Sequence, residues 1–185
     1  LRSAFSMVLS QPDALVNLTN ESRVATNLPV LKTNPLLIRA AESKASDMAK
    51  RGYFAHQTPE GLSPWVWLEQ VGYRFNYAGE NLAVNFFDSE DVVRAWMNSP
   101  THAANIVRAG FTEVGIGVAP GRFQGRDSLY VVQFFGRPSG ELVAPLSSQV
   151  LTALSALAQA NQVAPPRLNQ VLGAAVAATQ FTYWQ

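Results

Sequence analysis

The sequence predicts an α+β domain in which helices are layered against an antiparallel sheet. Cap and proline signals mark the starts of several helices in the first 110 residues, and two runs rich in β-branched and aromatic residues follow them. A loop with glycines separates the two runs, as in a hairpin, whereas parallel strands need a helical crossover. A chain of 185 residues, 48% hydrophobic and 15% charged, is long and apolar enough for one domain with a sizeable core.

The first two helices are predicted from the residues at their starts. Asp13 is expected to cap a helix that extends to Ala25 and carries Arg23 among its polar positions. In 34–52, an asparagine and a proline begin a second helix and a glycine ends it. Small residues dominate the apolar stripe of this helix and predict close packing: Leu37, Ala40, Ala41, Ala45, Met48 and Ala49.

Three further helices are predicted, over 63–72, over 89–98 and from Ser99 onward. A serine and a proline begin the first and the third of these helices, and Asp88 or Ser89 caps the second. The serines at these starts, Ser63 included, are therefore interpreted as caps rather than as nucleophiles. The third helix carries His102 in its first turn.

Three strands are predicted around these helices. The segments 113–119 and 127–136 are rich in β-branched and aromatic residues, and the glycines in 120–126 indicate the loop of a long hairpin between them. A shorter strand is expected over 80–86, with Glu80 at its start.

The two ends of the chain differ from the middle in composition. Residues 1–11 are interpreted as a leader remnant or a frayed terminus, and 12–138 as the main domain. Residues 139–185 are poor in charge and rich in Ala, Leu, Val and Gln, which predicts a helical extension or a membrane-proximal stalk. A membrane tether at the end of this segment, or outside it, is one possibility.

Charge and cysteine content exclude several classes of function. The 14 basic and 13 acidic residues form no basic cluster of the kind that binds phosphates, so no nucleic-acid partner is expected. The chain has no cysteine, which excludes disulfides, thiolate catalysis and zinc–thiolate sites.

Three residues are candidates for a functional site. His56 and His102 are the two histidines of the chain, and both lie in polar, turn-rich contexts away from apolar stripes. Imidazole is the commonest neutral metal ligand. Glu80 stands between a glycine and an asparagine, where a carboxylate could orient a histidine or a water.

Five motifs that surround these residues closely resemble the bacterial branch of the CAP superfamily, named for cysteine-rich secretory proteins, antigen 5 and pathogenesis-related 1 proteins. In order along the chain they are "AAESKASDMAKRGYFAHQTPEG", "AGENLAV", "AWMNSPTHAANIV", "FTEVGIGVA" and "YVVQFFG". The resemblance covers about residues 12–137 and does not extend to 140–185.

The resemblance implies a three-layer α-β-α sandwich with a central antiparallel sheet, export from the cell, and a central cleft of histidines and acidic residues. The family's two histidines fall on His56 and His102, and its Gly-Glu-Asn glutamate falls on Glu80. A second glutamate of many eukaryotic members is missing here, and Ser99 stands near its place. This departure makes a hydrolytic role less expected.

The favoured hypothesis is an extracellular or cell-surface binding domain whose cleft can hold a divalent metal such as zinc. The cleft would comprise His56, Glu80, Ser99 and His102, with the two histidines as ligands. Two protein ligands make a weak and exchangeable site, so the metal would not be obligatory. The domain is expected to be a binding protein rather than an enzyme.

Two alternatives belong to other classes of function. One is a metal-assisted hydrolase acting on peptide or cell-envelope substrates, with Glu80 as general base. The other is a protein that binds an apolar ligand such as a lipid, with one or two of the aromatic residues in 65–77 lining a groove and the rest in the core. The expected partner is accordingly a small molecule, a lipid or a cell-envelope component.

Overall fold

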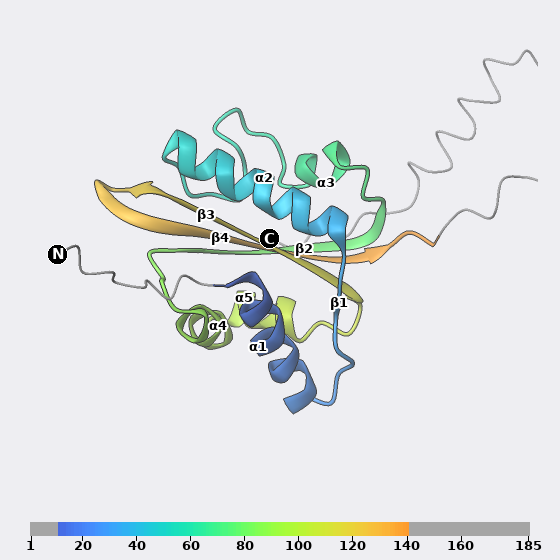
Figure 1. Cartoon of the computed structure of the whole chain (residues 1–185). Coiled ribbons are helices and arrows are strands. Elements are labelled where there is room, and N and C mark those ends of the chain that lie inside the picture. The colour runs from blue at the N-terminus through green and yellow to red at the C-terminus, as the bar shows by residue number, and fades with distance from the viewer. Residues whose placement is uncertain (1–10, 141–185) are drawn as a thin grey trace, which may run out of the picture. The chain divides into compact units, whose positions relative to one another are not determined.

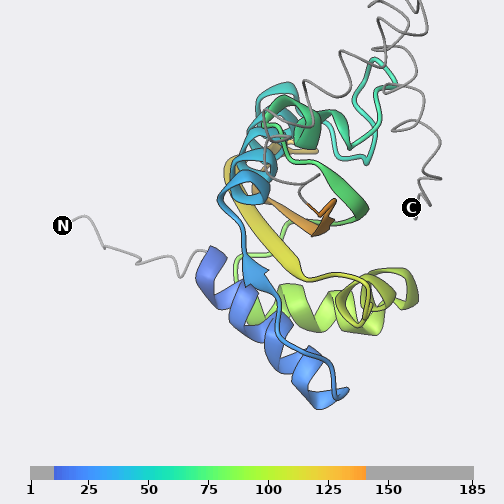
Figure 2. The same cartoon turned by 90° about the vertical axis from the view of Figure 1, so that its right-hand side faces the viewer.

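The structure, a computed structural model, describes residues 11–140 and contains a four-stranded sheet between two layers of helices (Figure 1). The elements follow in the order α1 (Pro12–Ala25), β1 (Lys32–Thr33), α2 (Pro35–Arg51), α3 (Val66–Gln70), β2 (Phe75–Val84), α4 (Ser89–Asn98), α5 (Pro100–Ile106), β3 (Glu113–Phe123) and β4 (Arg126–Pro138). Helices α2 and α3 cover one face of the sheet, and α1, α4 and α5 cover the other (Figures 1 and 2). This is the layered α+β domain that the residues predict, in the α-β-α form that the family resemblance implies.

The two faces of the sheet form two separate hydrophobic cores. Strand β4 is buried along most of its length because it lies between β3 and β2 and is covered on both sides. Its side chains alternate, so that Val132 and Phe134 pack under α2 whereas Val131 and Phe135 pack against the helices of the other layer. The richness in β-branched and aromatic residues that predicted this strand is therefore explained by burial on two faces.

The sheet order is β1-β3-β4-β2, and the long strands β2, β3 and β4 pair antiparallel, as predicted. The two-residue edge strand β1, which the sequence did not indicate, pairs parallel with β3. The expected loop over 120–126 is wrong, because pairing continues to Phe123↔Arg126 and leaves only Gln124 and Gly125 in the turn. Both have positive φ, 50° and 79°, as a tight hairpin turn of two residues requires.

Strand β2 is longer than the segment 80–86 that was predicted. It begins at Phe75 and ends at Val84, so Glu80 lies in the middle of the strand and not at its start. The polar and small residues at 76–79 carry no alternating pattern, which explains why the first half of the strand was missed.

Helix α2 lies unusually close to the sheet. A Cβ at Gly115 or Gly117 of β3 would overlap the backbone of α2, and one at Gly121 would press on Ala49. The glycines of β3 therefore match the small residues of α2, which confirms the close packing predicted from its apolar stripe.

The caps of α2 and α4 are as predicted, and two others are not. Asn34 accepts hydrogen bonds from the first turn of α2, and Asp88 accepts them from that of α4. Asp13 lies inside the first turn of α1, whose cap position is Gln11. Helix α3 begins only at Val66, because the Ser63 hydroxyl accepts from Trp65 N in a preceding turn.

Arg23 corrects the prediction of a polar face on α1. Its side chain is fully buried and donates to the carbonyl oxygens of Pro29, Ile106, Arg108 and Phe111. A buried guanidinium can be tolerated where its N–H groups find acceptors. Arg23 thus fastens the C-terminal end of α5 to α1.

Within residues 11–140, no helix is both long and apolar enough to cross a membrane. The leader remnant predicted for 1–11 and the helical extension predicted for 139–185 lie outside the described residues, apart from Gln11, Ser139 and Gly140.

Candidate functional site

Glu80 lies at the centre of a buried cluster of charged groups. Its side chain is 2% exposed, and its Oε2 lies 2.5 Å from Nζ of Lys44, which is fully buried on α2. Its Oε1 lies 2.5 Å from Nδ1 of His56. Because the ionised carboxylate can only accept, Nδ1 of His56 carries the proton of this hydrogen bond.

Side chains tie the loop that carries His56, residues 52–65, to α2 at three places, one of which is the hydrogen bond from the Tyr53 hydroxyl to Asp47. Lys44 Nζ donates to the carbonyl oxygen of His56 at 2.6 Å, and Arg51 at the end of α2 pairs with Glu60. Inside the loop, Thr58 makes hydrogen bonds with Leu62. The side chain of His56 is nevertheless 40% exposed, so the ring is accessible although its Nδ1 edge is held.

His102 lies in the first turn of α5, and Ser99 fixes its ring. Ser99 occupies the cap position of α5, but its hydroxyl makes no hydrogen bond to the helix backbone. Instead, Ser99 Oγ lies 2.8 Å from Nδ1 of His102. The interpretation of Ser99 as a side-chain cap is therefore wrong, because the imidazole competes with the backbone for the hydroxyl.

Two buried asparagines lie beside these residues. Asn81 Nδ2 donates to the carbonyl oxygen of His102 at 3.2 Å, and Asn105 Nδ2 donates to that of Glu80 at 3.1 Å. The indole of Trp96 on α4 donates to the carbonyl oxygen of Leu82 at 2.9 Å. Asn105 and Trp96 thus satisfy backbone carbonyl groups of the edge strand β2, whereas Asn81, which lies on β2, satisfies one of α5.

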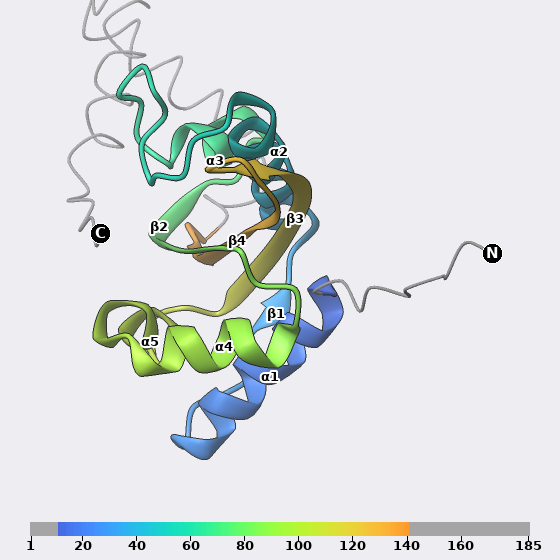
Figure 3. The same cartoon turned by 90° about the vertical axis from the view of Figure 1, so that its left-hand side faces the viewer.

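The site straddles the edge of the sheet at β2. In Figure 3 the loop between α2 and α3 lies above β2, and α5 lies below it. The side chains of Glu80 and Asn81 point to opposite faces because neighbouring residues of a strand alternate, so one contacts α2 and the other contacts α5. His56 and His102 therefore come from opposite layers of the sandwich.

Burial and charge set the protonation of this site. Burial lowers the pKa of Lys44, and the adjacent Glu80 carboxylate partly offsets that effect. Burial also lowers the pKa of His102, and the charge of His56 lowers it further. Both effects favour the neutral imidazole at His102.

The structure brings together the predicted residues as two pairs, His56 with Glu80 and Ser99 with His102. In both histidines the hydrogen bonds found in the described part of the chain engage Nδ1 rather than Nε2. Within residues 11–140, no three His, Asp or Glu side chains are grouped as a ready metal site. The arrangement thus offers two imidazoles, each oriented by an internal partner.

Lys44 was not predicted from the sequence as a site residue, although its position in the helix indicated burial. It lies one helical turn from both Ala40 and Met48, which is the buried face of α2. A lysine at such a position needs a buried anion, and Glu80 is the partner. The amide roles of Asn81 and Asn105 were also missed, because asparagine is ordinarily a surface or turn residue.

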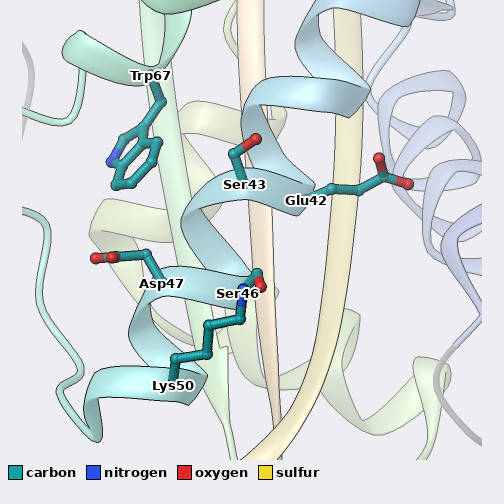
Figure 4. Close-up of a pocket in the computed structure, with 6 residues that line it drawn as sticks. All are labelled: Glu42, Ser43, Ser46, Asp47, Lys50 and Trp67. Atoms are coloured by element: carbon teal, nitrogen blue, oxygen red, sulfur yellow. The ribbon is translucent and has the colours of Figure 1, made fainter.

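A groove elsewhere on the domain lies along the outer side of α2. It has a volume of about 440 Å³ and is lined by Glu42, Ser43, Ser46, Asp47, Lys50 and Trp67. Figure 4 shows the Trp67 indole beside the polar side chains of α2. None of the candidate site residues lines this groove.

Comparison with known proteins gives a match to one family. A family model described as CAP, the cysteine-rich secretory protein family, matches residues 16–135. YkwD of Bacillus subtilis (strain 168) is 36% identical over 135 residues, which are 73% of this chain and 51% of YkwD. YlbC of the same organism, named as a membrane protein, is 32% identical over 56% of this chain and 30% of YlbC. The chain thus spans about half of YkwD and less than a third of YlbC.

Solved structures with a similar fold include extracellular and surface proteins. An extracellular protein of Bacillus anthracis that contains an SCP domain is 29% identical with a TM-score of 0.58, and the match covers 68% of this chain and 40% of that one. An outer surface protein of Borrelia burgdorferi is 24% identical with a TM-score of 0.59, over 69% of this chain and 92% of that one. At this lower identity the second comparison supports the fold alone.

Proposed function

Because the chain belongs to the cysteine-rich secretory protein (CAP) family, we propose that its α-β-α domain is an exported, non-enzymatic binding domain that holds a divalent cation such as zinc at His56 and His102. The observation that carries this proposal is that each imidazole has its Nδ1 engaged by an internal partner. With Nδ1 as the donor to its partner, Nε2 of each ring keeps a lone pair for a ligand, the arrangement typical of metal-binding histidines.

The donor set suits a weakly held ion. A neutral His102 is favoured by burial, and His56 is oriented by a buried carboxylate, so both rings are prepared for coordination. Since zinc in proteins takes four ligands, water or an oxygen of the bound partner would supply the other two. When bound, the ion would supply a Lewis-acidic point of attachment for an anionic or carbonyl oxygen.

Glu80 serves this site as an orienting group. Its two oxygens are engaged by His56 and Lys44, and its side chain is almost entirely buried. A general base must reach the water that it activates. The contacts of Glu80 therefore argue against the hydrolase alternative, in which this carboxylate would act on a water.

The lipid-binding alternative finds little support in the groove along α2. Five of its six lining residues are polar or charged, whereas sites for apolar ligands are lined mainly by hydrophobic side chains. Trp67 is the one aromatic residue of the 65–77 cluster that lines this groove.

Export is supported by the relatives. A structural relative that is 29% identical to this chain is an extracellular protein. We propose the same side of the membrane for this domain. The name of YlbC as a membrane protein keeps a tethered form within the proposal.

Calorimetric titration of zinc at pH 7 tests the metal site. The chain has two histidines and no cysteine, so no other imidazole or thiolate can replace His56 or His102. We expect His56→Ala and His102→Ala each to abolish the zinc binding of the native chain. Glu69→Gln, an exposed carboxylate on α3, is the control that should bind as the native chain does. Equal zinc binding by all four proteins would refute the proposal.

A further inference from the structure

The segments that carry Glu80 and His102 are joined by two crossed hydrogen bonds. Asn81, the residue after Glu80, donates to the backbone of His102. Asn105, one helical turn after His102, donates to the backbone of Glu80. Each asparagine therefore belongs to one half of the site and holds the backbone of the other half.

All four amide hydrogens of the two asparagines are used. Asn81 Nδ2 donates to His102 O and to Gln133 Oε1, and Asn105 Nδ2 donates to Glu80 O and to Asn81 Oδ1. Asn81 is fully buried and Asn105 is 8% exposed. Because water cannot replace these partners, the loss of one amide leaves buried carbonyl groups unsatisfied.

Gly79 makes this crossed arrangement possible. A Cβ at Gly79 would lie 2.6 Å from Cζ of Phe111 and 3.3 Å from Oδ1 of Asn105. A Cβ at this position would therefore displace the ring of Phe111 and press on the amide of Asn105. The three residues Gly79, Glu80 and Asn81 thus contribute space, an orienting carboxylate and an amide to one site.

We propose that Asn81 and Asn105 are positioning residues that set His102 at the distance and angle from Glu80, and hence from His56, that a shared ligand requires. Apart from these bonds, the two histidines are held by separate layers of the sandwich, His56 through α2 and His102 through α5. The crossed amides are the direct link between β2, which carries the orienting carboxylate, and α5. The inference rests on the proposed metal site for its ligand, but the positioning itself is a property of the metal-free protein.

The test compares Asn81→Ser and Asn105→Ser in the full chain with Thr19→Val. The hydroxyl of Thr19 accepts from Gln133 Nε2 at 2.9 Å, so Thr19→Val breaks the same buried network without touching the backbone of Glu80 or His102. We expect zinc affinity to fall roughly tenfold in both asparagine variants, as for other residues behind a metal ligand, and to change less than about twofold in Thr19→Val. Urea midpoints measured in parallel separate this effect from a general loss of stability.

A second readout needs no metal. In the metal-free protein, the imidazole NMR resonances of His102 should move in both asparagine variants and stay in place in Thr19→Val. Gly79→Ala provides a second perturbation that removes no hydrogen-bonding group. It should shift the same resonances, and it replaces the serine variants should they not fold.

The outcomes separate the two proposals. The positioning role alone would be overturned if His56→Ala and His102→Ala abolish the zinc binding of the native chain but the asparagine variants bind zinc with unchanged affinity. Absence of zinc binding by the native chain would overturn the metal site, and the imidazole resonances would then decide the positioning role. Equal shifts of the His102 imidazole resonances in the asparagine variants and in Thr19→Val would refute the positioning role.

Discussion

Replacing Lys44 by methionine tests whether the buried ion pair with Glu80 is what holds the site together. Methionine preserves most of the volume of the side chain but removes the ammonium group, which contacts Glu80 Oε2 at 2.5 Å and the carbonyl oxygen of His56 at 2.6 Å. The variant leaves a buried carboxylate with His56 as its remaining partner. Breaking a buried pair in this way costs about 3–5 kcal/mol of unfolding free energy.

A double-mutant cycle isolates the interaction between the two charges. Glu80→Gln alone leaves a buried ammonium without its anion and should also cost about 3–5 kcal/mol. Lys44→Met with Glu80→Gln removes both charges, so the remaining cost is mainly the unpaired carbonyl of His56, about 1–3 kcal/mol. The double variant should therefore be more stable than the sum of the single changes predicts, by at least about 3 kcal/mol.

Urea unfolding followed by tryptophan fluorescence at pH 7 measures this difference. Lys50→Met makes the same substitution at an exposed position of the same helix and should change stability by no more than about 0.5 kcal/mol. Should a single variant fail to fold while the double variant folds, the coupling is shown directly. Single effects that add to within about 0.5 kcal/mol would refute the reasoning.

Three other predictions concern the imidazoles and the close packing of α2. In an NMR titration the pKa of His102 should lie below its ordinary value of 6.5. The substitution His56→Gln should raise the pKa of His102 without reaching 6.5, because burial is the larger cause of the shift and the charge of His56 the smaller. A pKa of 6.5 or above for His102 in the native chain would contradict this prediction. Since the folded pKa lies below the unfolded one, the stability that His102 contributes is present above about pH 6.5 and is lost as the pH falls through the folded pKa. Ser99→Ala should weaken zinc binding roughly tenfold and change the unfolding free energy by less than about 0.5 kcal/mol, as calorimetry and urea unfolding would show; lost stability with unchanged affinity would instead identify a helix cap. Gly117→Ala should cost about 1–3 kcal/mol of unfolding free energy, measured in urea, because the new methyl group overlaps the backbone of α2. Gly110→Ala, whose methyl group meets no closer atom than 3.9 Å, is the control. Equal urea midpoints for Gly117→Ala and the native chain would show that α2 moves away without cost.

The layers of the fold could be predicted because their signals are local. Asn34 and Asp88 mark helix starts through hydrogen bonds to their own first turns, and the β-branched and aromatic residues of 127–136 indicate β4. The extent of the hairpin was underestimated, since glycine and proline in 120–123 suggested a loop although their backbone pairs regularly with β4. Gly121 is required there by the approach of Ala49, which no local pattern reveals.

The candidate site was predicted only where a residue type is rare or matches a family motif. His56 and His102 are the two histidines of the chain, and Glu80 lies in a family motif. The roles of Lys44 and Arg23 were not predicted, because the burial of a charge is decided by partners far away in the sequence: Glu80 lies 36 residues after Lys44, and the carbonyl groups bound by Arg23 lie up to 88 residues after it. Their side chains could be assigned to the interior only once those partners were known.

The side-chain hydrogen bonds to the backbone of β2 affect how this domain can bind other chains. Strand β2 is at the edge of the sheet, and an edge strand ordinarily invites a foreign strand to pair with its open backbone. Here the carbonyl groups of Glu80 and Leu82, which face away from β4, already accept from Asn105 and Trp96. An invading strand would have to displace two buried side-chain donors, at roughly 1–3 kcal/mol each. We therefore expect resistance to domain swapping and to fibril-like stacking along this edge, and a partner that recognises the domain here must do so through side chains rather than by extending the sheet.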